Sequence, residues 1–314
     1  MSEGIGASVQ RKEDKKFLTG KGRYTDDINR AGQIYAYFVR SDVAHANIKS
    51  IDTKAASSAS GVVAVYTGED VAADGIGGPI CGWVVQNRDG SGTHEHPHPL
   101  LAQGKVRFVG DAVAVVIAES VEQAKSASEL VEVDYEELSA VVNLETASSG
   151  AEIHEGMAEN RYFDWELGDE SETDKALKAA AKVIKLTVRN NRLIPNAMEP
   201  RCALAEYDDL DDSYTLHTTS QNPHLTRLVL AAFMFQIPES KLRVVAPDVG
   251  GGFGSKIYVY IEESVCVWAS KKLKRPIKWT ADRTQSFLTD AHGRDHVNNV
   301  QLALDDKNKI IGLR

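Results

Sequence analysis

Apolar residues in the first half of the chain come in short runs, a pattern typical of β-strands separated by turns. The runs at residues 33–39, 46–55, 61–66, 106–109, 112–117 and 131–135 predict strands. Ala124, Ala127 and Leu130 recur at helical spacing, which predicts a helix over residues 121–130. The sequence Thr-Gly-Glu-Asp at residues 67–70 predicts the start of another helix. Together these elements indicate a small α/β unit.

The second half of the chain continues the alternation of strand and helix patterns. Helices are predicted at residues 174–181 and 225–235, and strands at residues 183–189, 202–207, 213–219, 277–280 and 297–304. The small polar run at residues 147–151 is the best linker by composition. We therefore predict an α/β (α+β) chain with two domains, residues 1–145 and residues 146–314.

The last fifteen or so residues resemble a hairpin. Residues 300–304 form one strand pattern, residues 305–308 are turn-forming, and residues 309–314 look like a second strand that has barely begun. We expect the chain to be the N-terminal part of a longer polypeptide or one piece of a split subunit.

Composition and charge narrow the class of protein. The 314 residues are 42% hydrophobic and 26% charged, as in soluble globular proteins. With 36 basic and 45 acidic residues the net charge is −9, which disfavours binding to nucleic acid or to anionic lipid. The most apolar run, residues 112–118, is too short to span a membrane, and residues 1–16 lack the apolar core of a signal peptide. Cys81, Cys202 and Cys266 are too few and too widely spaced for a disulfide framework or an iron–sulfur site, so a cytoplasmic setting is expected.

A glycine-rich stretch at residues 242–256 is the most informative part of the sequence for function. A short apolar strand leads into the turn Gly250-Gly-Gly-Phe-Gly254, and a helical pattern follows over residues 257–273. Glycine permits positive φ angles and lets a ligand approach backbone N–H groups, so this turn suits an anion or a metal-oxo group. Glu262 and Glu263 near the start of the helix, with lysines near its end, complement the helix dipole.

Two common glycine motifs do not match this stretch. Counting from Gly250, the sixth position of a dinucleotide fingerprint is Ser255 rather than glycine. A phosphate-binding P-loop needs glycine immediately before its lysine, and here Ser255 precedes Lys256. The residues alone leave two alternatives open: an enzyme that binds a phosphate or a nucleotide in this turn, and a turn that only packs a helix against a strand.

Three histidines at alternate positions, His94, His96 and His98, are a second candidate site. Neutral imidazole is a common ligand for transition metals. The prolines between the histidines favour an extended loop, however, and no fourth ligand is evident in the sequence. We favour an exposed loop over a metal site.

Four motifs occur in a fixed order along the second half of the chain. They are MEPR at residues 198–201, TTSQNPH at residues 218–224, GGGFGSK at residues 250–256 and DAHGRDH at residues 290–296. Together they resemble the large, molybdenum-cofactor-binding subunit of the xanthine dehydrogenase, aldehyde oxidase and carbon monoxide dehydrogenase family, with a pattern closest to aerobic carbon-monoxide-dehydrogenase-like large subunits. Residues 22–27 and 110–138 resemble the N-terminal hammerhead-like α/β domain of the same family. The resemblance implies a hammerhead-like domain followed by the first part of a molybdenum-cofactor-binding domain.

The resemblance assigns roles to particular residues. It implies that the cofactor is bound by Gln221, Gly251, Gly252, Phe253 and Gly254. In the family, the glutamine hydrogen-bonds a molybdenum-bound oxygen, the aromatic residue lies beside the metal, and no side chain ligates the metal directly. The residues themselves leave other possibilities: the glutamine side chain can cap its own backbone, and the aromatic ring can plug the core.

The resemblance also places Ile257 and Arg294 in the substrate pocket. Purine-oxidising members of the family have a glutamate directly after the loop lysine, where this chain has Ile257, so a purine substrate is disfavoured. Arg294 can face the cofactor or form a salt bridge with Asp290 or Asp295. We favour a structural role for Glu199, paired with Arg201 or Arg192 in the core, over a direct role in catalysis.

The activity that the resemblance implies is oxidation of an aldehyde, carbon monoxide or a heterocycle, with water as the oxygen source. Electrons would pass to an iron–sulfur (2Fe–2S) small subunit and an FAD-binding medium subunit, in a dimer of heterotrimers. The molybdenum–molybdopterin cofactor is expected in its cytosine dinucleotide form. The family's general-base glutamate is expected beyond Arg314, so no catalytic residue is assigned within the chain. A non-catalytic docking half of a split subunit is the remaining alternative.

Overall fold

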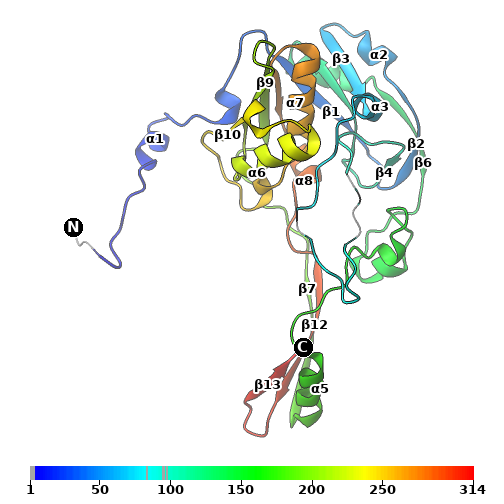
Figure 1. The fold of residues 1–314 in the computed structure, drawn as a ribbon, viewed down its shortest axis with the longest axis vertical. Helices are drawn as coiled ribbons and strands as arrows, with labels where there is room; N and C mark the ends of the chain where they lie inside the picture. The colour runs from blue at the N-terminus through cyan, green and yellow to red at the C-terminus, as the bar shows by residue number, and fades with distance from the viewer. Residues whose placement is uncertain (1–3, 83, 94–95, 97) are drawn as a thin grey trace.

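The computed structural model describes residues 4–82, 84–93, 96 and 98–314. In the body of the molecule, every residue of the strand β5 (Ala112–Ala118) is buried. The uninterrupted apolar sequence AVAVVIA suits a strand that is covered on both faces. Figure 1 shows this body with a narrow projection at one end and an N-terminal arm that reaches away from it.

A seven-stranded mixed sheet contains β5 and has the order β10-β9-β8-β11-β1-β5-β3. Its other strands are β1 (Ile34–Arg40), β3 (Val62–Thr67), β8 (Cys202–Asp208), β9 (Ser213–Thr218), β10 (Leu242–Val245) and β11 (Ile277–Thr280). β11 lies between β1, with which it pairs in parallel, and β8, with which it pairs antiparallel. The sheet therefore continues across residue 145, and the domain boundary there stays a prediction.

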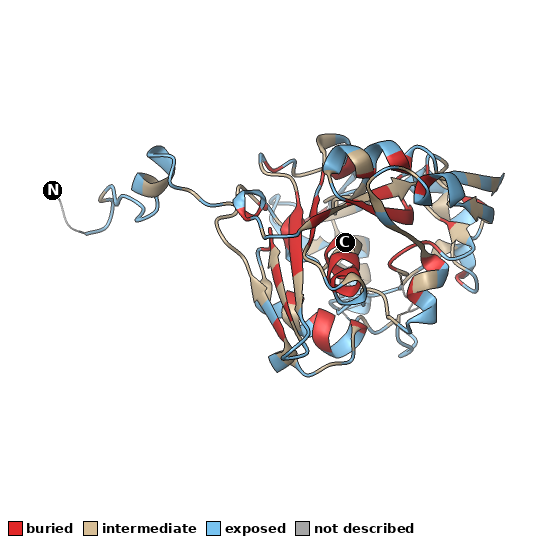
Figure 2. Cartoon of the chain, turned by 90° about the horizontal axis from the view of Figure 1, so that it is seen from above, coloured by how far each residue is buried: buried red, intermediate tan, exposed pale blue. Residues whose placement is uncertain are grey.

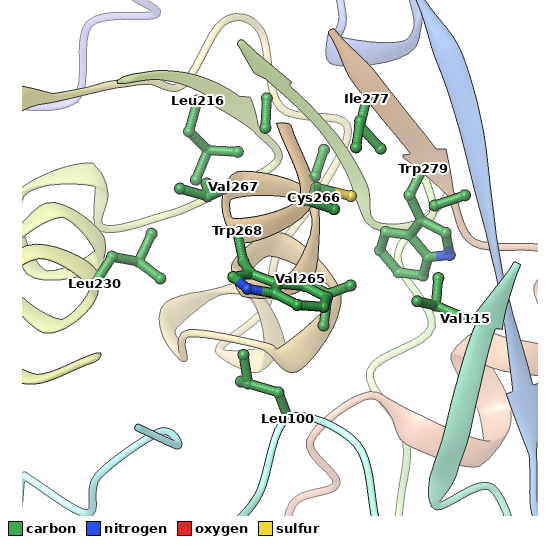
Figure 3. Close-up of a cluster of buried hydrophobic side chains, with 14 of the residues drawn as sticks. Leu100, Val115, Leu216, Leu230, Val265, Cys266, Val267, Trp268, Ile277 and Trp279 are labelled. Atoms are coloured by element: carbon green, nitrogen blue, oxygen red, sulfur yellow. The ribbon is translucent and has the colours of Figure 1, made fainter. Parts of the chain in front are cut away.

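α7 (Ile261–Leu273) is the helix at the centre of the main core. Its buried side chains include Val265 and Trp268, which lie in one cluster with Ile277 of β11 (Figure 3). Figure 2 shows that burial is concentrated in this helix and in the strands of the body. The helix begins four residues later than residue 257, where it was predicted, because Ser255–Ile257 form a separate 3₁₀ turn.

Further helices cover the sheet. α4 (Val121–Ser128) contacts β1 and β5, and α6 (Pro223–Leu228) contacts β10 and continues as a π-helical turn (Val229–Met234). The shorter helices are α1 (Asp14–Leu18), α2 (Lys54–Ser57), α3 (Gly68–Ala73) and α8 (Arg283–Thr289), and 3₁₀ turns occur at Thr25–Asp27, Leu144–Ser149, Ala158–Asn160 and Glu239–Lys241. Among the described residues, no helix is both long enough and apolar enough to cross a membrane.

A second sheet has three strands in the order β4-β2-β6. Their bounds are β4 (Lys105–Val106), β2 (Ala46–Asp52) and β6 (Glu132–Glu137). The strand predicted at residues 106–109 ends at Val106, because the carboxylate of Asp111 accepts a hydrogen bond from the N–H of Arg107 and the chain turns there. A small cluster that includes Ala46 and Val113 forms the core beneath this sheet.

The projection is a third sheet, β13-β12-β7, with α5 packed against it (Figure 1). Its elements are β7 (Lys182–Asn190), β12 (His296–Leu304), β13 (Ile310–Leu313) and α5 (Glu170–Ala179). β7 and β12 pair along their full lengths, from Lys182 opposite Leu304 to Asn190 opposite His296. All of β7 except its last residue is exposed, so hydrogen bonds rather than burial hold this strand.

The segment predicted as a linker, residues 147–151, is tied to its surroundings. Part of it lies in the 3₁₀ turn Leu144–Ser149. The side-chain amide of Asn160 donates to the carbonyl oxygens of Ala147 and Ala151. The small polar residues therefore form a hydrogen-bonded connection rather than a free tether.

Candidate functional site

The glycine turn that follows β10 adopts backbone conformations that favour glycine. Gly251, Phe253 and Gly254 have φ angles of 96°, 52° and 92°, all in the left-handed region. Phe253 has the only side chain among these three, and it is 74% exposed. The alternative in which Phe253 plugs the core is therefore wrong, and the ring lies at the surface beside Gly251, where an added Cβ would come within 2.8 Å of it.

The turn presents three consecutive backbone donors. Within the described part of the chain, the N–H groups of Gly251, Gly252 and Phe253 have no hydrogen-bond acceptor. A Cβ on Gly252 would lie 2.4 Å from Oε1 of Gln221, so only glycine lets the turn approach that side chain. Free N–H groups in such a turn attract anionic or oxo groups. The turn therefore fits a cofactor that offers oxygen acceptors.

Gln221 lies beside the turn, three residues after the end of β9. Its backbone N–H donates to the carbonyl oxygen of Lys256 (2.8 Å), and its Oε1 accepts from the N–H groups of Gly254 (3.0 Å) and Lys256 (3.3 Å). The alternative in which Gln221 caps its own backbone is therefore wrong, because its amide oxygen caps the glycine turn. Since two N–H donors hold the oxygen, the amide nitrogen of this exposed residue is left as a donor without an acceptor among the described residues.

Glu199 holds the two ends of the turn. Its Oε2 accepts from the N–H of Gly250 (2.7 Å) and from Nζ of Lys256 (3.0 Å). Lys256 also donates to the backbone oxygen of Glu199 (2.8 Å) and is 2% exposed. The structural role predicted for Glu199 has a different partner from the one expected, because Arg201 and Arg192 are not in ion pairs with it in the described structure.

Arg201, in the MEPR motif, joins this motif to the DAHGRDH motif and to the start of α7 from a buried position. Its guanidinium donates to both carboxylate oxygens of Glu262 (2.7 and 3.2 Å) at the start of α7 and to Asp290 (2.6 Å). It also lies 3.7 Å from the centre of the Tyr260 ring. Asp290 pairs with Arg201, and among the described residues it forms no ion pair with Arg294, a pairing that the sequence left as one of the alternatives.

The two glutamates at the start of α7 are buried, and their pKa values move in opposite directions. Burial alone would raise the pKa of Glu262, but the charges of Arg201 and Arg40 outweigh it and lower the pKa to about 2. Glu263 is in no ion pair among the described residues, and burial raises its pKa to about 7. The hydroxyl of Thr218 lies 2.6 Å from Glu263 Oε1 and opposes that rise.

The Glu263→Gln substitution is expected to remove a loss of stability that the wild-type protein undergoes as the pH rises. Because the pKa of Glu263 is about 7 in the folded protein against 4.5 for a free side chain, its stabilising contribution is complete below about pH 4.5 and is lost as the pH rises through 7. At about 1.4 kcal/mol per pKa unit, the loss is on the order of 3 kcal/mol. Urea midpoints measured between about pH 4 and pH 9 test this expectation. The exposed Glu122→Gln variant is the control, and equal declines in Glu263→Gln and wild type would contradict it.

The two residues assigned to a substrate pocket differ in their relation to the turn: the N–H of Ile257 donates to the carbonyl oxygen of Gly254 (3.4 Å), whereas Arg294 has no hydrogen bond with the turn among the described residues. Ile257 directly follows Lys256 and is 39% exposed. Arg294 is exposed with a φ of 68°. Within the described residues it forms no hydrogen bond or ion pair with the turn, with Asp290 or with Asp295. Their part in substrate binding stays a prediction.

The histidine run is described only in part. His94 lies outside the described residues, His96 is exposed, and its ring centre is 5.0 Å from that of His154. Among the described residues, no group of three His, Cys, Asp or Glu side chains is placed to hold a metal ion.

Tyr260 is a residue of the site that the sequence patterns did not indicate. Its hydroxyl donates to the carbonyl oxygen of Ser255 (2.5 Å) and accepts from the N–H of Ala291 (2.8 Å). It thereby connects the end of the glycine turn to the DAHGRDH motif. A tyrosine just before a helix carries no recognisable signal in one sequence, so only the structure reveals this link.

The geometry defines a class of protein: a mixed α/β body that carries a glycine turn with free backbone donors, braced by an amide and a buried ion pair. Two family models match the chain, the molybdopterin cofactor-binding domain over residues 153–314 and the aldehyde oxidase and xanthine dehydrogenase a/b hammerhead domain over residues 19–139. The first covers more than half of the chain. The chain therefore belongs to the molybdopterin cofactor-binding family of the xanthine dehydrogenase and aldehyde oxidase type, and the predicted family and fold class are confirmed.

Individual relatives agree with this assignment. The chain is 35% identical to the nicotine 6-hydroxylase large subunit of Paenarthrobacter nicotinovorans and 35% identical to the carbon monoxide dehydrogenase large chain of Afipia carboxidovorans, over 99% of its length in both cases. It spans 37% and 39% of those relatives. The structure of quinoline 2-oxidoreductase from Pseudomonas putida 86 superposes with a TM-score of 0.89 at 35% identity, covering 98% of this chain and 38% of that one.

Proposed function

We propose that the chain is the N-terminal part of the large subunit of a molybdenum hydroxylase. Such an enzyme oxidises an aldehyde, carbon monoxide or a heterocyclic compound, with water as the source of oxygen. The proposal draws on relatives that are longer than this chain, including a nicotine hydroxylase and a carbon monoxide dehydrogenase. The family's general-base glutamate is not assigned to any residue of this chain.

The observation that carries the proposal is the arrangement of Gln221 against the glycine turn. The two N–H groups that hold Oε1 of Gln221 orient its amide nitrogen as a donor. The free N–H groups of Gly251, Gly252 and Phe253 lie in the same short turn. These donors would hold the oxygen atoms of a molybdenum–molybdopterin cofactor. When bound, that cofactor supplies the redox centre of the reaction.

The surrounding residues keep this donor set in place and set its environment. Glu199 and Lys256 hold the ends of the turn, and Tyr260 connects it to the segment after α8. Phe253 presents an exposed ring at the open side of the turn. Ile257 gives the same region an apolar side chain without a carboxylate, which favours a non-purine substrate.

The partners and setting follow from the same proposal. Relatives are named as large subunits, as a large chain and as the gamma subunit of a complex, which supports assembly with other chains. We propose a 2Fe–2S small subunit and an FAD-binding medium subunit in a dimer of heterotrimers, with the cofactor in its cytosine dinucleotide form. A cytoplasmic location is proposed as well.

Metal and pterin analysis of the native complex tests the proposal. The complex should be purified from its source with all associated chains, which mass spectrometry then identifies. We expect close to one molybdenum and one pterin per copy of this chain, together with iron and flavin in the partner chains. A fully assembled complex without molybdenum would overturn the proposal. Binding of ATP or of inorganic phosphate in the turn of that metal-free complex would support the phosphate-binding alternative.

A further inference from the structure

We propose that Glu199 and Lys256 form a buried clasp that holds the cofactor-binding turn closed, and that both act as positioning residues. The inference rests on the proposed function for its link to the cofactor, but the restraint on the turn can be tested without the cofactor. Neither residue has a role assigned by the comparisons. The clasp is defined by these two side chains and by the turn between Gly250 and Lys256.

A single carboxylate oxygen connects the two ends of the turn. Oε2 of Glu199 accepts from the N–H of Gly250 at 2.7 Å and from Nζ of Lys256 at 3.0 Å. The three free N–H donors lie between these two attachment points in the sequence. A change in the distance between the attachment points therefore changes the geometry of the donors.

Backbone contacts make the connection at Gly250 reciprocal. The N–H of Glu199 donates to the carbonyl oxygen of Gly250 (3.2 Å), while the N–H of Gly250 donates to the Glu199 side chain. An added Cβ on Gly250 would lie 2.5 Å from Cβ of Glu199. The glutamate stem thus packs directly on the turn, and this close approach requires glycine at position 250.

The lysine end of the clasp is held in the same way. Nζ of Lys256 donates to Oε2 and to the backbone oxygen of Glu199 (2.8 Å). Burial lowers the pKa of Lys256, and the carboxylate of Glu199 opposes that shift. The side chain of Lys256 is 1% exposed and that of Glu199 is 13% exposed, so water cannot replace either partner without rearrangement.

The clasp is separate from the ion pairs that hold α7. Arg201 binds Glu262 and Asp290, and neither carboxylate is in an ion pair with Lys256. Removing the clasp therefore leaves the attachment of the helix to the sheet in place. This separation predicts that a clasp variant loosens the turn while the body stays folded.

Lys256→Met removes the charge and keeps most of the side-chain volume. In the native complex, we expect amide hydrogen exchange in a peptide covering residues 250–256 to become about tenfold faster, with exchange in α4 and β5 unchanged. Lys271→Met is the matched control, because that lysine pairs with Asp212 at the exposed end of α7. Unchanged exchange in the turn of Lys256→Met would overturn the clasp.

The double variant Glu199→Gln/Lys256→Met tests whether the clasp positions the cofactor-binding turn or only stabilises the fold. The double variant leaves no unpaired buried charge, so its denaturation midpoint should recover toward wild type relative to Lys256→Met. We expect Lys256→Met and the double variant alike to retain about tenfold less pterin and molybdenum than wild type and to show an altered Mo(V) electron paramagnetic resonance spectrum, because the clasp is lost in both. Recovery of retention and spectrum together with stability would overturn the positioning role. A wild-type complex without molybdenum would overturn the proposed function, and hydrogen exchange would still decide whether the clasp exists.

Discussion

Replacing Arg201 by methionine is expected to lower the free energy of unfolding by about 3–5 kcal/mol, the range found when one partner of a buried ion pair is removed. The guanidinium is 1% exposed and binds Glu262 and Asp290, which are 1% and 8% exposed in their side chains. Arg40 would still pair with Glu262 at 2.6 Å, so Asp290 is the carboxylate left without a cation. Its charge would remain buried with only weak compensation.

Urea denaturation of the native complex, followed by tryptophan fluorescence, measures this effect. Trp279 is suited to report it, because its ring centre lies 5.1 Å from the Arg201 guanidinium. Arg275→Met is the matched control: Arg275 forms a two-point contact with Glu119, but the pair is exposed and should contribute no more than about 1 kcal/mol. Similar midpoint shifts in the two variants would show that the buried ion pairs of Arg201 stabilise the fold no more than the exposed pair of Arg275 does.

Gly252→Ala is expected to weaken cofactor binding without unfolding the protein. The new Cβ would lie 2.4 Å from Cδ and Oε1 of Gln221, at the movable end of an exposed side chain. The fold can relieve the clash by displacing that side chain, so we expect little loss of stability. Displacement breaks the hydrogen bonds from the N–H groups of Gly254 and Lys256 to Oε1. The amide nitrogen of Gln221 is then no longer oriented toward the cofactor. At about 2 kcal/mol for a hydrogen bond to a charged group, the loss of this contact would weaken binding roughly thirtyfold.

Molybdenum and pterin contents after gel filtration of the native complex measure this loss. Gly92→Ala is the control, because a Cβ there meets nothing within 4 Å, the residue has no positive φ, and it lies outside the four motifs. It should keep the wild-type contents. Full retention of cofactor by Gly252→Ala would show that the contact between this glycine and Gln221 is not needed for binding.

Hydrophobic spacing predicted most of the secondary structure, and the burial of the strands explains why. β5 carries a continuous apolar sequence because both of its faces are covered. Hydrophobic periodicity gave less information where side-chain hydrogen bonds determine at which residue a strand or helix begins or ends. The strand predicted at residues 106–109 is cut short by Asp111, and the helix at residues 225–235 starts earlier because Asn222 caps it.

The candidate site was predictable in its local part only. The glycine turn and Gln221 were expected together from ordered motifs, and the structure places them in hydrogen-bonding contact. The pairs that brace the site join residues far apart in sequence, such as Glu199 with Lys256 and Arg201 with Asp290. A single sequence does not reveal which of several charged residues will form an ion pair with one another. The burial of Glu262 and Glu263 could not be predicted either, because a favourable interaction with the helix dipole does not require a glutamate to be buried.

The position of β11 in the large sheet has a consequence for synthesis on the ribosome. β11 joins β1 to β8, so the sheet remains two separate pieces, each with an open edge, until residues 277–280 have left the exit tunnel. At about 5–20 residues per second, the open edge of β1 waits on the order of tens of seconds for that partner. Exposed strand edges recruit other chains during such a delay. Nascent chains of this protein are therefore expected to depend on chaperones until β11 has been synthesised and has paired with β1 and β8.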